Sequence, residues 1–220
     1  MCQSGLQQLE AEQVVDLGAF QSDLFNQKSL EFYRGTETKE TLDAIDSKVE
    51  LVVKLLAPHM LLSAAHKVLE YLIRIYEVHI HHKYLLLNAL LPYFETVYFL
   101  KAIQCLNLEK DELYSFLHQF AYQGHAIDKK TLVKALGRNS GLLFTKYSDF
   151  CFILLDLQAN QDQAASSNLH WKFFGSMMIE VLREHSSDET LLFSVLPFLA
   201  KGLKQQVARE LKIASFLTIN

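Results

Sequence analysis

The hydrophobic and polar positions of this chain follow a helical period along nearly its whole length. Between residues 64 and 78 the polar side chains are spaced by one, three, four and three residues, which places them on one narrow stripe of a helix. The same arrangement recurs between residues 169 and 182, where the polar line is Lys172, Ser176, Glu180 and Arg183. A further helix is expected over residues 41–56, with a polar stripe at Asp43, Asp46, Glu50 and Lys54. No alternating strand pattern longer than a few residues competes. The pattern therefore predicts an all-α fold.

The apolar part of these helices is wide. A helix on the surface of a compact domain needs an apolar stripe of roughly 100°. The helices at residues 64–78 and 169–182 are apolar around well over half of their circumference, so each must be covered on two or three sides. Stacked helical hairpins cover a helix in this way, and a closed bundle does the same for its central helices. The pattern alone leaves both architectures open.

An internal similarity favours stacked helical repeats. Residues 86–94 (LLNALLPYF) resemble residues 191–199 (LLFSVLPFL), and each segment has a proline before an aromatic residue, where a helix kinks or breaks. Pro58 follows a third apolar run. Degenerate helical repeats of roughly 40–50 residues have this appearance. We therefore predict a single domain over residues 1–220, an α-solenoid of about five irregular HEAT-like helical hairpins.

Capping residues predict where several helices begin and end. Ser63 is a candidate N-cap for the helix at residues 64–78, and SSDE at residues 186–189 is a capping box that opens a later helix. Asp128 is expected to cap a helix over residues 129–136, which ends at Gly137. Two segments have the composition of loops: residues 139–141 and 158–163.

Composition narrows the possible functions. Hydrophobic residues make up 50% of the chain, which is enough to form a core and argues against disorder. The formal net charge is -4, whereas proteins that bind a phosphate backbone usually have a positive excess. No signal peptide and no apolar stretch of roughly 18 residues is present, so no membrane partner is expected. The three cysteines are widely spaced without a CxxC pair, which predicts neither disulfides nor a zinc site and fits a reducing, intracellular compartment.

No recognisable catalytic motif is present. The sequence has no P-loop, GxGxxG, HExxH or nucleophile elbow, so we expect no catalytic residue, no cofactor and no small-molecule substrate. The histidine-rich segment His79-Ile80-His81-His82 is the strongest candidate for metal ligands, with His66 or Glu77 as additional ligands. Metal binding needs three or four converging groups, and histidines at a helix end more often bind the last carbonyl groups. We therefore expect no metal site.

Two groups of polar residues are candidate contact surfaces. For protein binding we predict the helical stripe together with a corner that follows a proline break: His66, Lys67, Glu70, Arg74, Tyr93, Glu95 and Thr96. Corners between helices commonly carry the partner contacts of a solenoid. For RNA contact the weaker candidates are Lys201, Lys204, Arg209 and Lys212. These charges match a few phosphates, but Glu210 interrupts them and no aromatic residue is interleaved, so a solvated face is the competing interpretation.

Four segments resemble one known family: residues 55–62 (LLAPHMLL), 65–74 (AHKVLEYLIR), 76–81 (YEVHIH) and 91–96 (LPYFET). They are similar to the N-terminal region of the HEAT-repeat scaffold family of the small-subunit processome, named U-three small nucleolar RNA-associated protein ten or HEAT repeat-containing protein one. Weaker similarity, for example at residues 5–9 and 196–204, extends the resemblance over most of the chain. Residues 113–124 and 156–167 follow the family only loosely. Family members are many times longer, so the chain is expected to be an N-terminal fragment.

The resemblance implies a non-enzymatic scaffold of ribosome biogenesis in the nucleolus, linked to the transcription and processing of pre-ribosomal RNA. The partners it implies are processome proteins, above all a WD-repeat β-propeller subunit, and the 5′ external transcribed spacer of pre-ribosomal RNA or its ribonucleoprotein. Two alternatives stay open. One is a module that binds pre-ribosomal RNA directly through the basic residues between 201 and 212. The other is a generic adaptor or transport-type solenoid that captures a short peptide in a concave groove.

Overall fold

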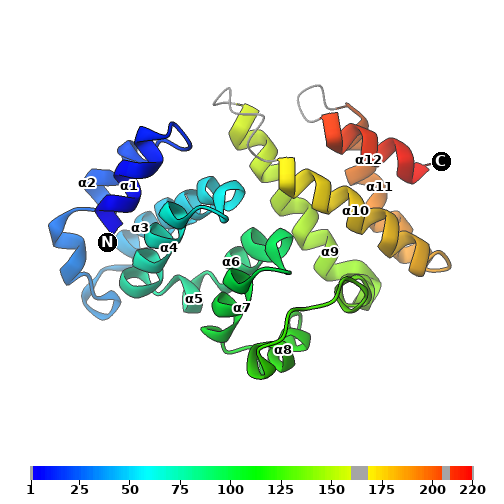
Figure 1. The fold of residues 1–220 in the computed structure, drawn as a ribbon, viewed down its shortest axis with the longest axis horizontal. Coiled ribbons are helices and arrows are strands. Elements are labelled where there is room, and N and C mark those ends of the chain that lie inside the picture. Colours follow the sequence, from blue (N-terminus) through cyan, green and yellow to red (C-terminus); the bar gives the residue numbers. More distant parts are fainter. Residues whose placement is uncertain (1, 160–167, 205–208, 220) are drawn as a thin grey trace. The chain divides into compact units, whose positions relative to one another are not determined.

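The computed structural model describes residues 2–159, 168–204 and 209–219. Within these residues the secondary structure consists of α-helices and short 3-10 turns, without a strand, so the predicted all-α fold class is confirmed. The chain divides into two compact units, Met1–Leu91 and Pro92–Asn220 (Figure 1). Each unit has its own internal packing and is described by itself.

The first unit is built from helices packed in pairs. Its helices are α1 (Cys2–Ala11), α2 (Gln21–Leu24), α3 (Lys39–Leu56), α4 (Ser63–Tyr76), α5 (Val78–His81) and α6 (Lys83–Leu90). Helix α4 packs against α1, α3 and α5, and α3 also packs against α6 (Figure 1). The close approach of α1 to α4 requires a glycine, because a Cβ at Gly5 would lie 2.8 Å from the carbonyl oxygen of Ala64. The wide apolar arc of α4 is thus covered on several sides, as its sequence predicted.

The second unit repeats this pairing of helices. It contains α7 (Val97–Gln104), α8 (His118–Gln123), α9 (Lys129–Ala159), α10 (Asn168–Glu184), α11 (Glu189–Lys204) and α12 (Arg209–Ile219). Helices α10 and α11 both pack against α9 and α12, and α7 packs against α8. Glycines allow α12 to approach its neighbours, since a Cβ at Gly175 would overlap Ala214 and a Cβ at Gly202 would overlap Ser215. Such packing of helix pairs is the packing expected of helical repeats.

The core of the second unit follows the predicted faces of α10. The apolar residues of this helix are buried: Trp171, Phe173, Phe174, Met177, Met178 and Val181. Along the predicted polar line, Lys172, Ser176 and Arg183 are exposed and Glu180 is half-buried. The side of α10 opposite the predicted polar line therefore forms core. In the described part of the chain, no helix combines the length and apolar character that a membrane span requires.

The predicted end of a helix at Gly137 and the predicted loop at residues 139–141 are wrong, because α9 continues through both. Gly137 leaves room for a neighbouring ring, since a Cβ there would overlap the imidazole of His185. Gly141 has φ +72° and also lies against another helix, where a Cβ would overlap Leu191. Both glycines therefore serve the packing of helices rather than a helix end. Of the loop predicted at residues 158–163, the first two residues continue α9 and the others lie outside the described residues.

The three prolines do not act alike. Pro58 and Pro92 lie in the 3-10 turns η4 (Ala57–His59) and η5 (Leu91–Tyr93), directly after α3 and α6, so the predicted breaks there are confirmed. Pro197 lies inside α11, which continues on both sides of it. The buried side chains of Val195 and Leu199 hold the two halves of α11 in place. The similar segments at residues 86–94 and 191–199 thus differ in backbone structure.

The predicted cap at Asp128 is confirmed and the cap at Ser63 is wrong. The predicted capping box at residues 186–189 is displaced by two residues, because α11 begins at Glu189 and Asp188 is its cap. Asp128 Oδ1 accepts a hydrogen bond from the Thr131 backbone N–H at 2.9 Å, and Asp188 Oδ1 accepts one from the Leu191 N–H at 3.0 Å. Ser63 is instead the first residue of α4, which has no side-chain cap. The hydrogen bonds from the Thr131 hydroxyl and backbone lower the pKa of Asp128.

We expect the substitution Asp128→Ala to loosen the first turn of α9, because the first N–H groups of a helix have no partner inside it. Hydrogen exchange at the Thr131 amide is expected to accelerate. Since the pKa of Asp128 is lowered in the folded state, the contribution of its carboxylate is complete above the ordinary pKa. It is lost as the pH falls through the lowered value. Asp188→Ala is the matched control and should loosen α11 alone. Unchanged exchange at Thr131 would contradict the assigned cap.

Candidate functional site

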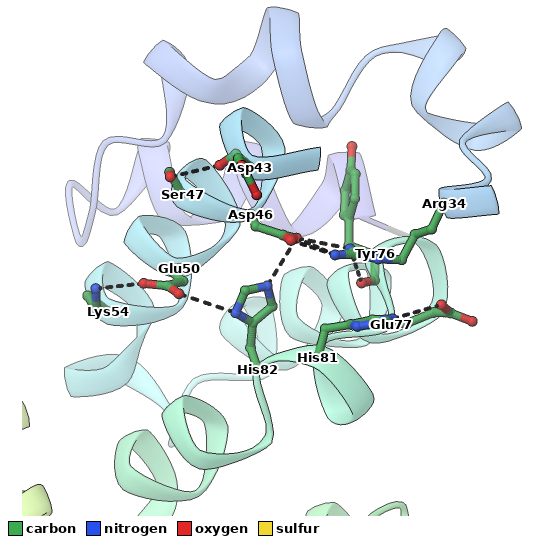
Figure 2. Close-up of polar contacts among 10 residues, drawn as sticks. All are labelled: Arg34, Asp43, Asp46, Ser47, Glu50, Lys54, Tyr76, Glu77, His81 and His82. Carbon is green, nitrogen blue, oxygen red and sulfur yellow. Dashed lines mark hydrogen bonds and ion pairs between the residues drawn. The ribbon is translucent and has the colours of Figure 1, made fainter. Parts of the chain in front are cut away.

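A cluster of charged side chains joins three segments of the first unit (Figure 2). We name it the Arg34–His82 cluster, and it consists of Arg34, Asp46, Glu50, Lys54 and His82. Arg34 lies in the 3-10 turn η3 and donates to Asp46 of α3, with Nη1 2.9 Å from Oδ1 and Nη2 2.5 Å from Oδ2. His82, between α5 and α6, has Nε2 3.1 Å from Asp46 Oδ1 and Nδ1 3.4 Å from Glu50 Oε1. Lys54 Nζ donates to Glu50 Oε2 at 3.2 Å.

The Arg34–His82 cluster is largely shielded from solvent. The side chains of His82 and Arg34 are 9% and 14% exposed. Arg34 Nη1 also donates to the carbonyl oxygen of Tyr76 at 3.4 Å, at the point where α4 ends in the left-handed residue Glu77. Both ring nitrogens of His82 face carboxylates, Nε2 toward Asp46 and Nδ1 toward Glu50. The cluster therefore binds η3, α3 and the junction of α5 with α6 to one another.

The histidine-rich segment is divided among separate contacts. His82 belongs to the Arg34–His82 cluster, whereas His81 lies with Nε2 3.4 Å from Glu77 Oε2 (Figure 2). His79 Nδ1 is buried without a hydrogen-bond partner, and His66 Nε2 lies 2.6 Å from the carbonyl oxygen of Met60. In the described ranges no group of three histidine, cysteine or acidic side chains is arranged to hold a metal ion. These histidines therefore have separate surroundings rather than converge on one point.

The predicted protein-binding stripe of α4 is split by α1. His66 and Lys67 are half-buried, and Lys67 Nζ donates to Ser4 Oγ of α1 at 3.4 Å. Glu70 and Arg74 remain open to solvent, with 48% and 69% of their side chains exposed, and form an ion pair of 2.6 Å. Only this second half of the stripe is fully accessible to a partner.

The predicted residues at the corner before α7 have different roles. The Tyr93 side chain is 2% exposed, and its ring lies 6.1 Å from that of His170. Thr96 caps α7: its hydroxyl oxygen accepts from the Phe99 N–H at 3.2 Å, and its O–H donates to the Tyr93 carbonyl oxygen at 2.7 Å. Glu95 is exposed. Among Tyr93, Glu95 and Thr96, Glu95 is thus the accessible residue. These three residues belong to the second unit, whereas the stripe of α4 belongs to the first.

The predicted RNA-contact residues lie at the ends of α11 and α12. Lys201 is engaged within the unit, since its Nζ lies 4.7 Å from the centroid of the Phe152 ring and 3.8 Å from Asp156 Oδ2. The other three predicted residues are exposed: Lys204, Arg209 and Lys212. Sequence reasoning missed the apolar residues that share the exposed side of α12, Ile213, Phe216 and Leu217. Their positions are visible as a spacing of three and four residues, but the sequence does not tell which face of a helix is covered.

Groups with possible chemistry also meet inside the second unit. Tyr147 lies with its hydroxyl oxygen 3.3 Å from His170 Nδ1, and both side chains are fully buried. Burial raises the pKa of the Cys151 thiol, which contacts Tyr147, to about 12. Since the thiolate is the nucleophilic form, this thiol is unreactive near neutral pH. The three residues therefore act as core.

A shallow pocket of about 350 Å³ opens beside α1 in the first unit. Its lining includes Phe25, Leu30 and Tyr71 together with the uncharged Gln3 and Gln27. Cys2 also faces it, and burial raises the pKa of this thiol to about 11. The pocket thus has room for an apolar side chain but offers no charged group to a cofactor.

Comparison with known proteins finds several relatives, which carry one of two names. The chain is 26% identical over 208 residues to HEAT repeat-containing protein 1 of Homo sapiens, covering 91% of this chain and 9% of that protein. It is 26% identical over 198 residues to the protein of the same name from Danio rerio, covering 86% and 9%. It is 24% identical over 206 residues to U3 small nucleolar RNA-associated protein 10 of Meyerozyma guilliermondii, covering 90% and 11%. No protein-family model matches the chain.

The chain spans about a tenth of the length of the curated relatives it matches. The similarity to the human protein covers 91% of this chain, so it extends over both helical units. The relatives carry two names, HEAT repeat-containing protein 1 and U3 small nucleolar RNA-associated protein 10. Both are names of the one family that residues 55–96 resemble. Over about 90% of its length, the chain is homologous to the family of HEAT repeat-containing protein 1 and U3 small nucleolar RNA-associated protein 10.

Proposed function

We propose that the chain serves as a non-enzymatic scaffold segment in ribosome biogenesis, and that it binds partner proteins on its helical surface in the nucleolus. The observation that carries this proposal is the homology over about 90% of the chain. One of the relatives is named for its association with U3 small nucleolar RNA. We extend that association to this chain and infer that it acts in the small-subunit processome.

The helical packing supports a scaffold rather than an enzyme. Each pair of helices exposes one edge to solvent. Where several pairs stack, these edges together form a long surface for partner proteins. The groups with the most reactive chemistry, Cys151, Tyr147 and His170, are buried and serve the core. Binding through exposed side chains of α-helices needs no catalytic constellation.

The finer part of the proposal concerns the partner and the face. We assign the contact with a WD-repeat β-propeller subunit to Glu70 and Arg74 of α4, with the half-buried His66 and Lys67 on the same helix. An exposed ion pair between residues four apart contributes only about 0.3–0.5 kcal/mol to stability, so both side chains can change partners at little cost. Arginine is among the residues that contribute most to protein interfaces.

Size-exclusion chromatography of the chain with each purified β-propeller subunit, beside labelled pre-ribosomal leader RNA, tests the proposal. We expect a stable complex with one propeller, which Arg74→Glu abolishes. Arg183→Glu is the matched control, because Arg183 is 72% exposed, belongs to the second unit and pairs with Glu180 on its own helix at 3.7 Å. The control variant should elute with the propeller unchanged.

Two outcomes would contradict parts of this proposal. One is binding of the leader RNA without any protein partner, weakened by substitution of Lys204 and Lys212. That result would make the chain an RNA-binding module. The other is equal loss of the propeller from both arginine variants, which would reject the assigned face.

A further inference from the structure

Three exposed cations lie in a row on the first part of α9. Lys130, Lys134 and Arg138 are spaced by four residues, so they share one face of the helix with a rise of about 6 Å from each to the next. None of the three makes an ion pair with another described side chain. The row ends before Gly141, where φ is +72° and the helical period is interrupted. We name these three residues the α9 basic row.

The electrostatics of α9 itself disfavour the α9 basic row. Like charges four residues apart on a helix repel each other. The start of a helix favours carboxylates, yet apart from the cap Asp128 the first turn of α9 contains no acidic residue. Between residues 129 and 148 the sequence has basic residues and no carboxylate. Positions that oppose the local preference without a compensating contact are often functional ones.

Carboxylates border the α9 basic row on one side. On the neighbouring line of α9, Lys129 Nζ lies 3.4 Å from Glu180 Oε1 of α10. An open pocket of about 370 Å³ lies at this border, and it is lined by Lys129, Lys130, Val133, Glu180 and Glu184. Glu184 is exposed and makes no ion pair with a described side chain. The surface therefore presents a row of cations beside an exposed carboxylate.

This mixture of charges distinguishes between anionic partners. A nucleic-acid strand has a phosphate at every nucleotide, so phosphates would also approach Glu184, which repels them. A protein helix can place carboxylates over the cations and a basic side chain over Glu184. Carboxylates four residues apart on that helix rise by the same distance of about 6 Å, so they match the row in spacing. The pattern therefore favours a protein helix over a nucleic acid.

We propose that the α9 basic row binds a helix of a partner protein that carries a carboxylate at every fourth residue. These carboxylates pair with Lys130, Lys134 and Arg138, and a basic side chain next to them lies over Glu184. Exposed ion pairs are individually weak and are screened by salt, so the contact is salt-sensitive. The inference goes beyond the scaffold function proposed above, because it names the chemistry of a further partner and a site on the second unit.

Two synthetic helices of equal composition test the inference. One carries three glutamates at every fourth position, and the other carries the same glutamates distributed around the helix. Their binding to the chain is measured by fluorescence anisotropy at several salt concentrations. We expect the patterned helix to bind roughly tenfold more tightly at low salt. The difference should shrink as salt screens the charges.

A matched pair of variants tests the face. Lys134→Glu should weaken the binding of the patterned helix by roughly tenfold or more, whereas Lys146→Glu should leave it unchanged. Both are exposed lysines of α9 and both substitutions change the net charge equally, but Lys146 lies beyond Gly141 and outside the row. A patterned helix whose central glutamate is replaced by lysine should bind Lys134→Glu more tightly than the original helix does. Circular dichroism verifies that both variants remain folded.

Several results would overturn the inference. Equal affinity for the two synthetic helices removes the role of the spacing, and equal loss in Lys134→Glu and Lys146→Glu removes the role of the face. Single-stranded RNA that binds more tightly than the patterned helix and is lost in Lys134→Glu would identify a nucleic acid as the occupant. A chain that keeps its Arg74-dependent propeller complex but binds neither helix would reject this inference alone.

Discussion

Phe174→Ala is expected to destabilise the second unit by about 3–5 kcal/mol in free energy of unfolding. The Phe174 side chain is fully buried on α10, and its ring stacks on that of Phe144 with a centroid distance of 5.7 Å. A second ring, Phe152, meets it edge-on at 6.0 Å. The substitution removes both ring contacts and leaves a cavity between α9 and α10, which close packing on either side prevents from collapsing. Urea denaturation followed by circular dichroism measures the loss.

Phe193→Ala is the control for this prediction. Phe193 lies on α11 in the same unit, and 69% of it is exposed. Removal of an exposed ring usually changes the free energy of unfolding by less than about 0.5 kcal/mol. Similar losses in the two variants would show that Phe174 does not lie in the core as the structure places it.

Arg34→Ala is expected to lower the free energy of unfolding of the first unit by about 2 kcal/mol. Removing one partner of a buried ion pair typically costs about 3–5 kcal/mol, and partial exposure of this pair reduces that figure. Without the guanidinium, the Asp46 carboxylate retains only His82 nearby, and the Tyr76 carbonyl oxygen loses a donor. The first unit should therefore loosen where η3 meets the end of α4. Denaturation and hydrogen exchange in α3 measure the effect.

Arg74→Ala provides the comparison for Arg34→Ala. Its guanidinium also pairs with a carboxylate, but 69% of the side chain is exposed, so a change below about 0.5 kcal/mol is expected. The double variant Arg34→Ala/Asp46→Ala should lose less than the sum of the two single losses, because removing both partners leaves no buried charge uncompensated. Equal losses in free energy of unfolding for Arg34→Ala and Arg74→Ala would show that the Arg34–His82 cluster stabilises the first unit no more than an exposed ion pair does.

The surface of α4 is proposed to bind a partner protein. On α4, Glu70 and Arg74 form an exposed ion pair whose members can exchange their partner for one on another protein. The variant Arg74→Glu tests this surface.

Features that depend on neighbouring residues were predictable from the sequence. The alternation of Lys172 and Ser176 with Trp171 and Phe174 identified the core side of α10, because the helical period acts within a few residues. The cap at Asp128 followed from the same local geometry, since its partner Thr131 lies three residues away. The all-α class and the family resemblance rest on many such local patterns.

Contacts between distant segments were not predictable in the same way. Gly137 looked like the end of a helix, and only the packing of His185 against it shows why a glycine stands inside α9. Asp46 and Glu50 belong to the predicted polar stripe of α3, but the stripe gives no sign that Arg34 and His82 contact these carboxylates in the folded unit. The sequence around a glycine is the same whether it ends a helix or leaves room for a neighbour. The sequence around a carboxylate is likewise the same whether it faces solvent or an ion-pair partner.

The candidate surfaces show the same division between local and tertiary information. The sequence by itself determined that the chain is helical, which faces of its helices are apolar, and that Asp128 begins a helix. Only the tertiary structure decided that Tyr93 is buried and that α1 lies against Lys67 in the first half of the α4 stripe. Helical period is set by the backbone of one segment, whereas solvent exposure depends on which other segments pack against it.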